Sequence, residues 1–148
     1  MNNQREGGFL IAKVHQLAGR IFARNLKLHN IDEINPAQGR ILFALWKEDN
    51  ISIQELAKMT SLEKSTLTSM LDRLEETGHL SRIPSKEDRR KILIKLTEKN
   101  KALHDVYVRV SEEMTELFYG GFASEEIDGF EGYLRRILHN LENASSKE

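Results

Sequence analysis

The sequence predicts a mainly α-helical protein that carries one small β-hairpin. Three observations lead to this fold class. Long stretches near both ends of the chain hold apolar residues at helical spacing. Two shorter helical stretches, separated by a turn, lie in the middle, and two strand-like runs joined by a cationic loop follow them. The 148 residues are 39% hydrophobic and 30% charged, a composition typical of a globular chain with a packed core.

The first two helices are predicted from their apolar stripes and from one start signal. Two stripes run along Phe9–Leu28, which is more apolar surface than one neighbouring helix can cover. Asn35 suits the N-cap and Pro36 the first helical position, so the second helix should run from Pro36 to Lys47. Ile51–Ile53 could add a short third strand to the sheet of the hairpin.

Two helices joined by a turn are expected next. Ser52 and Glu55 have the spacing of a capping box, so a short helix should follow and run through Met59. After the turn, a second helix is predicted from about Glu63 to Thr77, and Gly78 stops it. One face of this second helix is apolar and should be buried; it consists of Leu67, Met70, Leu71 and Leu74.

The opposite face of this helix has an unusual composition. Four hydroxyl residues occur between positions 65 and 69, although Ser and Thr are mediocre in helix interiors. A helix that enters the major groove of DNA benefits from short hydroxyl side chains and from a few cations. Chance enrichment on an ordinary surface helix is the alternative. The candidate DNA contacts on this face are Lys64, Ser65, Thr66, Thr68, Ser69 and Arg73.

The hairpin is predicted from two strand-like runs, Leu80–Pro84 and Lys91–Thr97. The loop between them is dense in cations. It is either an ordinary solvated loop or a wing that lays an arginine into the minor groove of DNA. Asp88 is out of place as a phosphate contact, and we expect it to orient Arg90 or Arg89 by a charge-assisted hydrogen bond. The candidate DNA contacts on the wing are Lys86, Arg89, Arg90 and Lys91.

Several short motifs lie along the two central helices and the hairpin. They are Glu55-Leu56-Ala57, Lys64-Ser65-Thr66, Leu71-Asp72-Arg73-Leu74-Glu75, Gly78-His79-Leu80, and above all Asp88-Arg89-Arg90 followed by Ile94-Lys95-Leu96-Thr97. Together they resemble the MarR family of winged helix-turn-helix transcriptional regulators, and the order of the flanking helices agrees over nearly the whole chain. The resemblance implies a homodimer on a pseudo-palindromic operator, with the helix from Glu63 in the major groove and Arg90 in the minor groove. It also implies that Asp72 is a structural partner for a wing or helix arginine.

The C-terminal part is predicted to be helical. Thr97 can cap a long helix that reaches about Tyr119, where Gly120-Gly121 breaks it. Ser124 is expected to cap a final helix, and the tail Asn143–Glu148 to be frayed. The first and the last two helices hold more apolar surface than one winged domain can bury, so we expect them to interleave with a second copy. A three-helix bundle closed within one chain is the alternative.

This organisation divides the chain into three parts. Residues 1–34 form an N-terminal helix of the dimerisation region, residues 35–101 the winged helix-turn-helix DNA-binding domain, and residues 102–148 the C-terminal dimerisation helices. The net charge is only −1, but Lys and Arg outnumber acidic residues eleven to eight in 53–101, whereas acidic residues outnumber them ten to four in 102–148. Such asymmetry is what a one-sided DNA footprint requires.

Other classes of protein are disfavoured by the composition. The chain has no cysteine, and its five histidines are scattered without the spacing of a metal site. No apolar run approaches the length of a membrane span, and the polar N-terminus has no signal-peptide core. We therefore expect a cytoplasmic protein without cofactor, metal, membrane partner or enzymatic activity.

A small-molecule effector is expected from the resemblance. Regulators of this family commonly take small phenolic or lipophilic anions in the crevice where the dimer helices meet the winged domain, and aromatic residues of this chain could line such a crevice. Plain core packing is the alternative for each aromatic residue. The candidates for the pocket are His15, Arg20, Phe22, Phe43, Trp46 and Tyr107.

The expected function is sequence-specific regulation of transcription by a homodimer, most simply as a repressor that a ligand releases or tunes. There are two rivals. A winged helix used only for protein contact would have no salt-dependent affinity for DNA. A sequence-tolerant architectural protein would bind random duplex nearly as well as any operator.

Overall fold

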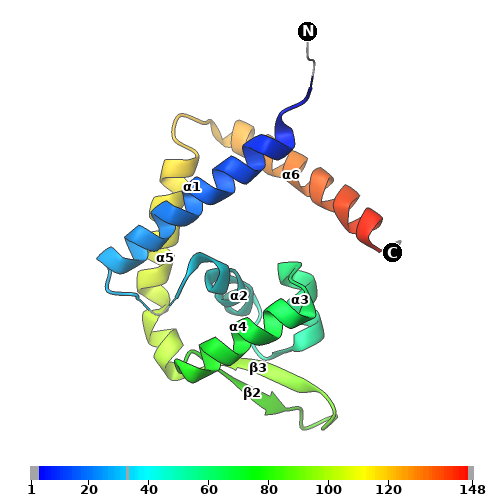
Figure 1. The fold of residues 1–148 in the computed structure, drawn as a ribbon. Coiled ribbons are helices and arrows are strands. Elements are labelled where there is room, and N and C mark those ends of the chain that lie inside the picture. Colours follow the sequence, from blue (N-terminus) through cyan, green and yellow to red (C-terminus); the bar gives the residue numbers. More distant parts are fainter. Residues whose placement is uncertain (1–3, 33, 147–148) are drawn as a thin grey trace. The chain divides into compact units, whose positions relative to one another are not determined.

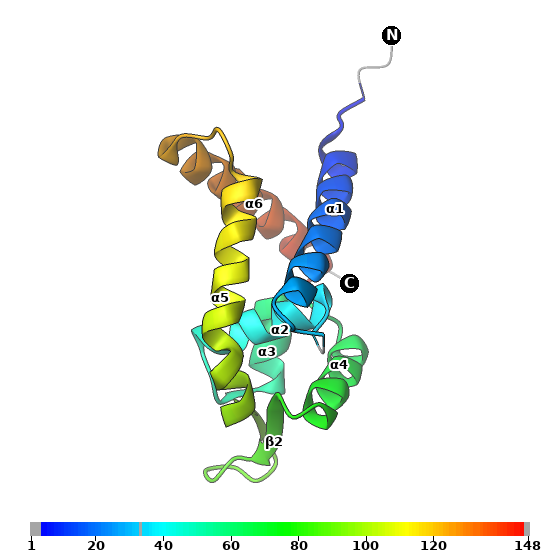
Figure 2. The same ribbon diagram turned by 90° about the vertical axis from the view of Figure 1, so that its left-hand side faces the viewer.

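A computed structural model of the chain describes residues 4–32 and 34–146. They form two compact units, Met1–Glu112 and Glu113–Glu148, which we describe separately. Figures 1 and 2 show the elements of each unit. In chain order these are α1 (Gly7–Leu28), α2 (Pro36–Lys47), β1 (Ile51–Ser52), α3 (Ile53–Thr60), α4 (Lys64–Glu76), β2 (Leu80–Pro84), β3 (Ile92–Leu96), α5 (Glu98–Phe118) and α6 (Ser124–Ser145). The mainly helical fold with a small hairpin is therefore confirmed.

The sheet has three antiparallel strands in the order β1-β3-β2. Ile51 of β1 pairs with Ile94 of β3, which confirms the short third strand expected from the sequence. On the other side of β3, the register runs from Leu80 opposite Leu96 to Pro84 opposite Ile92. This hairpin protrudes from the first unit in both views (Figures 1 and 2).

The hydrophobic core lies within the first unit. It draws on α1, α2, α3, α4, the sheet and the first part of α5. The predicted buried face of α4 is confirmed for three residues, whereas Met70 is only partly buried against the core. The largest completely buried apolar side chains are Leu26, Ile41, Leu42, Leu45, Leu56, Leu67, Leu71, Leu74, Leu80, Ile94 and Val110.

The helix starts follow local hydrogen-bonding rules, with one departure from expectation at α3. Asn35 caps α2 as predicted, because its Oδ1 accepts from the Gln38 backbone N–H at 2.8 Å while Gln38 Oε1 accepts from the Asn35 N–H at 3.1 Å. At α3, Ser52 accepts from the Glu55 N–H, but the Glu55 carboxylate accepts from the Ser52 hydroxyl group rather than from its backbone. The expected capping box is therefore only half formed.

Other bounds also differ from prediction. Ser124 is the first residue of α6 rather than its cap, since the Glu126 carboxylate accepts the orphan N–H of Ala123 at 2.8 Å. The last helix continues to Ser145, so the predicted frayed tail is wrong for residues 143–145. His79, which follows the helix stop at Gly78, is completely buried.

The second unit, from Glu113, contains the end of α5 and all of α6. It holds a partly exposed aromatic cluster in which Phe118, Tyr119 and Phe130 pack with ring centroids 5.0 to 6.4 Å apart. The Tyr119 hydroxyl donates to Glu131 Oε2 at 2.8 Å. Burial, followed by this bond to a carboxylate, raises the pKa of Tyr119. The cluster joins the two helices across the Gly120-Gly121 turn, where Gly121 adopts a φ of 85°.

Candidate nucleic-acid interface

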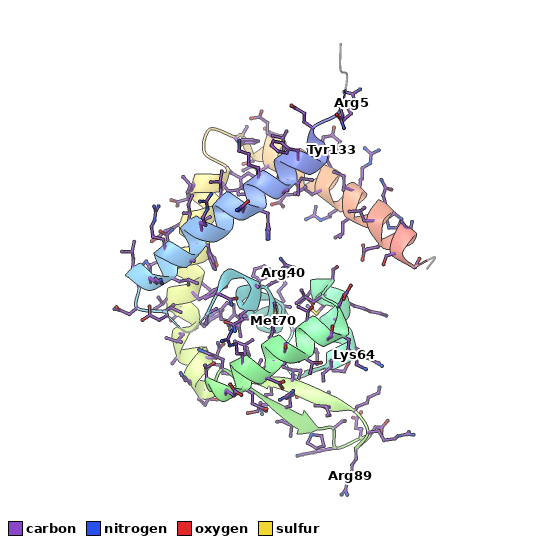
Figure 3. The ribbon with its side chains drawn as sticks, in the orientation of Figure 1. Arg5, Arg40, Lys64, Met70, Arg89 and Tyr133 are labelled. Atoms are coloured by element: carbon purple, nitrogen blue, oxygen red, sulfur yellow. The ribbon has the colours of Figure 1, made fainter. Side chains whose placement is uncertain are left out.

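Helix α4 presents a polar face with the composition expected of a DNA-reading helix. Its six candidate contacts, Lys64, Ser65, Thr66, Thr68, Ser69 and Arg73, are all exposed, and Figure 3 shows Lys64 at one end of the helix. The Thr68 hydroxyl donates to the Lys64 carbonyl oxygen at 2.8 Å. Its oxygen therefore stays available as an acceptor, for example of a base amino group.

The hairpin tip is held by hydrogen bonds in which Ser85 and Asp88 take part. The Ser85 N–H donates to the Lys91 carbonyl at 2.8 Å, and the Lys91 N–H donates to the Asp88 carbonyl at 2.9 Å. Asp88 Oδ1 accepts from both the backbone N and the Nε of Arg90, at 3.1 and 3.2 Å. The side chain of Arg90 is nonetheless 92% exposed, so its guanidinium is oriented but free to meet a ligand. Arg89 points away from the protein at the same tip (Figure 3).

Arg82 ties the hairpin to α4. Its Nη2 lies 2.6 Å from Asp72 Oδ1 and 2.8 Å from Glu75 Oε1, and its backbone N–H donates to Glu75 Oε2 at 3.0 Å. Asp72 thus pairs with a wing arginine. Because these bonds connect strand β2 to the helix, they set the angle between the hairpin and the face that carries the candidate contacts.

The ionisation of this group follows from its bonds. Hydrogen bonds from Arg82 to its carboxylate lower the pKa of Glu75. The hydrogen bond from the Arg82 side chain to Glu75, followed by the one to Asp72, raises the pKa of Arg82. Glu75 and Arg82 therefore stay charged at neutral pH, and the guanidinium neutralises acidic groups that would otherwise repel phosphates from α4.

Comparison with known proteins places this geometry in a family. The sequence model of the MarR family matches residues 34–92, from the start of α2 to β3. A mutant of MarR from E.coli, complexed with operator DNA, is similar with a TM-score of 0.78 and 29% identity, covering 88% of this chain and 92% of that one. Residues 34–92 belong to the MarR family. Relatives that the chain matches are HTH-type transcriptional regulators.

Two further relatives extend the comparison. HTH-type transcriptional regulator TtmR of Methylorubrum extorquens (strain PA1) is 36% identical over 85 residues, which are 57% of this chain and 42% of that protein. The chain thus spans less than half the length of TtmR. BpsR of Bordetella bronchiseptica, whose DNA binding is regulated by 6-hydroxynicotinic acid, has a TM-score of 0.80 and 25% identity over 93% of this chain and 96% of that one.

The candidate ligand residues of this chain separate into two groups. Phe22, Trp46 and Tyr107 pack edge to face, with ring centroids 5.4 Å apart for Phe22–Tyr107 and 4.4 Å for Trp46–Tyr107. His15, Arg20 and Phe43 are exposed instead, and the Lys47 ammonium lies over the Phe43 ring at 4.8 Å. The structure thus joins three of the six into a packed aromatic cluster.

Sequence reasoning missed two polar arrangements. Arg82 was not among the candidates, although the i, i+3 spacing of Asp72 and Glu75 predicts one acidic patch that could hold a cation. The second arrangement is a buried network in which Asn100 Oδ1 accepts from Trp46 Nε1 at 3.0 Å, while Asn100 Nδ2 lies 3.1 Å from His79 Nδ1. With Asn100 as the donor, the His79 ring carries its proton on Nε2.

No helix among residues 4–32 and 34–146 is both long enough and apolar enough to cross a membrane.

Proposed function

We propose that the chain binds double-stranded DNA as a homodimer, with α4 in the major groove and the β2–β3 tip in the adjacent minor groove of a pseudo-palindromic operator. One observation carries this proposal: the exposed polar face of α4 is tied through Arg82 to a hairpin whose Arg90 is already oriented by Asp88. The similarity to a MarR structure complexed with operator DNA supports it. In this proposal residues 35–101 are the DNA-binding domain.

The homodimer is supported by the apolar surface of α1. Leu10, Val14 and Leu17 follow one another at helical spacing and are 51%, 44% and 46% exposed. An exposed apolar stripe of this kind marks an interaction site. A second copy related by a two-fold axis would cover it, with residues 1–34 and 102–148 as the dimerisation region, and would set the two reading helices roughly 34 to 36 Å apart.

The regulator is proposed to act as a repressor that a small anion tunes. The regulation of BpsR by 6-hydroxynicotinic acid supports this part, because that relative aligns with nearly the whole chain. The effector would favour one spacing of the two reading helices over another. A phenolic or lipophilic anion, a cytoplasmic location and the lack of enzymatic activity belong to the same proposal.

The test is a DNA titration with a wing variant. A duplex selected by the protein from random sequence and a scrambled duplex are titrated at two salt concentrations. Arg90→Ala should weaken binding to the selected duplex by about tenfold or more, whereas Arg109→Ala, an exposed arginine of α5 outside the proposed interface, should have no effect. Lys86→Ala and Lys91→Ala should weaken both duplexes alike and lower the salt slope by about 1 per phosphate contact per subunit.

Each rival has its own outcome. Wild-type protein that binds the two duplexes almost equally would be an architectural protein, because specific binding is usually about 10³- to 10⁷-fold tighter than non-specific binding. If the protein shows no salt-dependent affinity for either duplex, the winged helix serves protein contact instead.

A further inference from the structure

The end of α4 and the start of α5 are bonded to each other within the first unit. In Figure 1 the start of α5 lies beside the C-terminal end of α4. Two backbone carbonyl groups of the turn after α4 accept hydrogen bonds from side chains at the start of α5. The Thr97 hydroxyl donates to the Gly78 carbonyl at 2.5 Å, and Lys99 Nζ donates to the Thr77 carbonyl at 2.6 Å. We call these four residues the helix-end clamp.

The Thr97 hydroxyl joins the two helix ends through one oxygen atom. Besides donating to Gly78, it accepts from the Asn100 N–H at 3.3 Å, so Thr97 caps α5 as the sequence predicts. Gly78 has a φ of 83°, the left-handed conformation in which many helices end. The Thr97 backbone N–H donates to the next carbonyl, that of His79, at 3.1 Å. The end of α4 and the cap of α5 therefore depend on the same residue.

Lys99 adds a charge to the clamp. Its ammonium group lies at the C-terminal end of α4, where the helix dipole favours a cation. Its stem runs over Gly78, since Lys99 Cδ would be 3.5 Å from a Cβ built on that glycine. The Lys99 side chain is exposed, and exposed charged contacts contribute little to overall stability. An effect of Lys99 on DNA binding would therefore be an effect on geometry.

The clamp connects the helix that carries the candidate DNA contacts to a helix that continues beyond Glu112 into the second unit. Its meaning rests on the proposed function, in which α4 reads DNA and residues 102–148 help to join two subunits. The angle between α4 and α5 would then determine the distance between the two reading helices. One base pair changes the separation of two half-sites by only roughly 3.4 Å. We propose that Thr97 and Lys99 are positioning residues, which hold α4 at a fixed angle to α5 and so determine the half-site spacing that the dimer accepts.

The first measurement needs no DNA. The chain has no cysteine, so cysteines that are introduced can be spin-labelled selectively. Ser69→Cys on α4 and Arg109→Cys on α5 are both at exposed positions of the first unit. Dilution with unlabelled protein leaves only the distance within one protomer. Electron paramagnetic resonance should find a narrow distribution of this distance with the intact clamp, and a shifted or broader one after Thr97→Val or Lys99→Met.

The second measurement compares duplexes that differ in half-site spacing. Insertion or removal of one base pair between the half-sites of the selected duplex should weaken wild-type binding by about tenfold or more. For Thr97→Val and Lys99→Met the same change should weaken binding by less than about threefold. A duplex with a single half-site should bind these variants within about twofold of wild type, because the exposed face of α4 is unchanged.

Matched variants separate the clamp from the helix cap and from charge. Thr97→Ser and Lys99→Arg keep the donors and should keep the wild-type spacing preference. Thr97→Asp keeps an acceptor for the Asn100 N–H but has no hydrogen to donate at neutral pH, so it should behave like Thr97→Val although α5 stays capped. Lys101→Met removes an exposed lysine further along α5, whose ammonium lies 3.7 Å from Glu98, and should bind as wild type does.

The outcomes distinguish this inference from the proposed function. The positioning role is overturned if Thr97→Val and Lys99→Met keep the wild-type distances and spacing preference, if they lose affinity for the single half-site to the same extent, or if Lys101→Met acts as they do. If wild type binds no duplex while the clamp variants change the distance between the labels, the proposed function fails and the control of the helix angle stands. Normal DNA binding with unchanged distances has the opposite meaning.

Discussion

The hydroxyl group of Tyr107 on α5 occupies the space in which a side chain on Gly39 of α2 would begin. A Cβ built on Gly39 would also meet the Phe22 ring at 3.6 Å. The absence of a side chain at Gly39 therefore allows α2 and α5 to approach closely at the aromatic cluster. This contact is a glycine requirement of packing rather than of backbone conformation.

Gly39→Ala should lower the free energy of unfolding by about 1 to 3 kcal/mol, because the added methyl group overpacks a buried contact. The double variant with Tyr107→Phe should recover most of the loss, since the colliding hydroxyl is then gone. Gly19→Ala is the control: it lies in α1 with open space around it, and alanine should stabilise the helix slightly. Urea denaturation of wild type and of these three variants gives the free energy of unfolding of each. Equal destabilisation of the single and double variants would contradict the collision.

The same tyrosine makes stability depend on alkaline pH. Burial raises the pKa of Tyr107 above its ordinary value. The neutral phenol is thus favoured in the folded chain, and its contribution is present below the unfolded pKa of about 10 and is lost as pH rises above it. Denaturation of wild type between about pH 8 and 11 should show a steeper loss of stability than denaturation of Tyr107→Phe. Parallel curves for the two proteins would show that the phenol ionises freely in the folded state.

The buried network around Asn100 predicts a larger cost. Asn100→Leu removes the acceptor of Trp46 Nε1 and the donor to His79 Nδ1, and leaving such groups unpaired costs about 1 to 3 kcal/mol each. Asn143→Leu is the control, because Asn143 is exposed and its contact with His139 is open to water. If thermal denaturation finds the two variants equally stable, water or a rearranged side chain must replace the network.

The sequence predicted the parts of the fold that depend on neighbouring residues. The bounds of α2 follow from Asn35 and Pro36, which act within a few residues of the helix start. The bond between Trp46 and Asn100 joins residues 54 positions apart, and no periodic pattern reports such a pair. For the same reason the burial of His79 emerges only when distant helices are brought together. Candidate DNA contacts could be predicted because they share one helix face or one loop.

Arg82 should matter more for DNA binding than for stability. Asp72 and Glu75 keep 53% and 38% of their side-chain surface exposed, and pairs exposed to this degree contribute at most about 1 kcal/mol. Arg82→Met should therefore change the urea midpoint little. Its affinity for the selected duplex should nevertheless fall about tenfold, although Arg82 is not among the proposed DNA contacts.

Two causes could produce that fall in affinity, and a triple variant separates them. In Arg82→Met the carboxylates of Asp72 and Glu75 lose their counter-charge and repel phosphates, and the hairpin also loses its attachment to α4. Adding Asp72→Asn and Glu75→Gln removes the repulsion but cannot restore the attachment. At about 0.5 M salt, screening suppresses charge repulsion between exposed groups. If the affinity of Arg82→Met stays low at this salt concentration, and the triple variant does not recover it, the loss is caused by the orientation of the hairpin. Full recovery of DNA affinity in the triple variant would show that Arg82 acts only by neutralising Asp72 and Glu75.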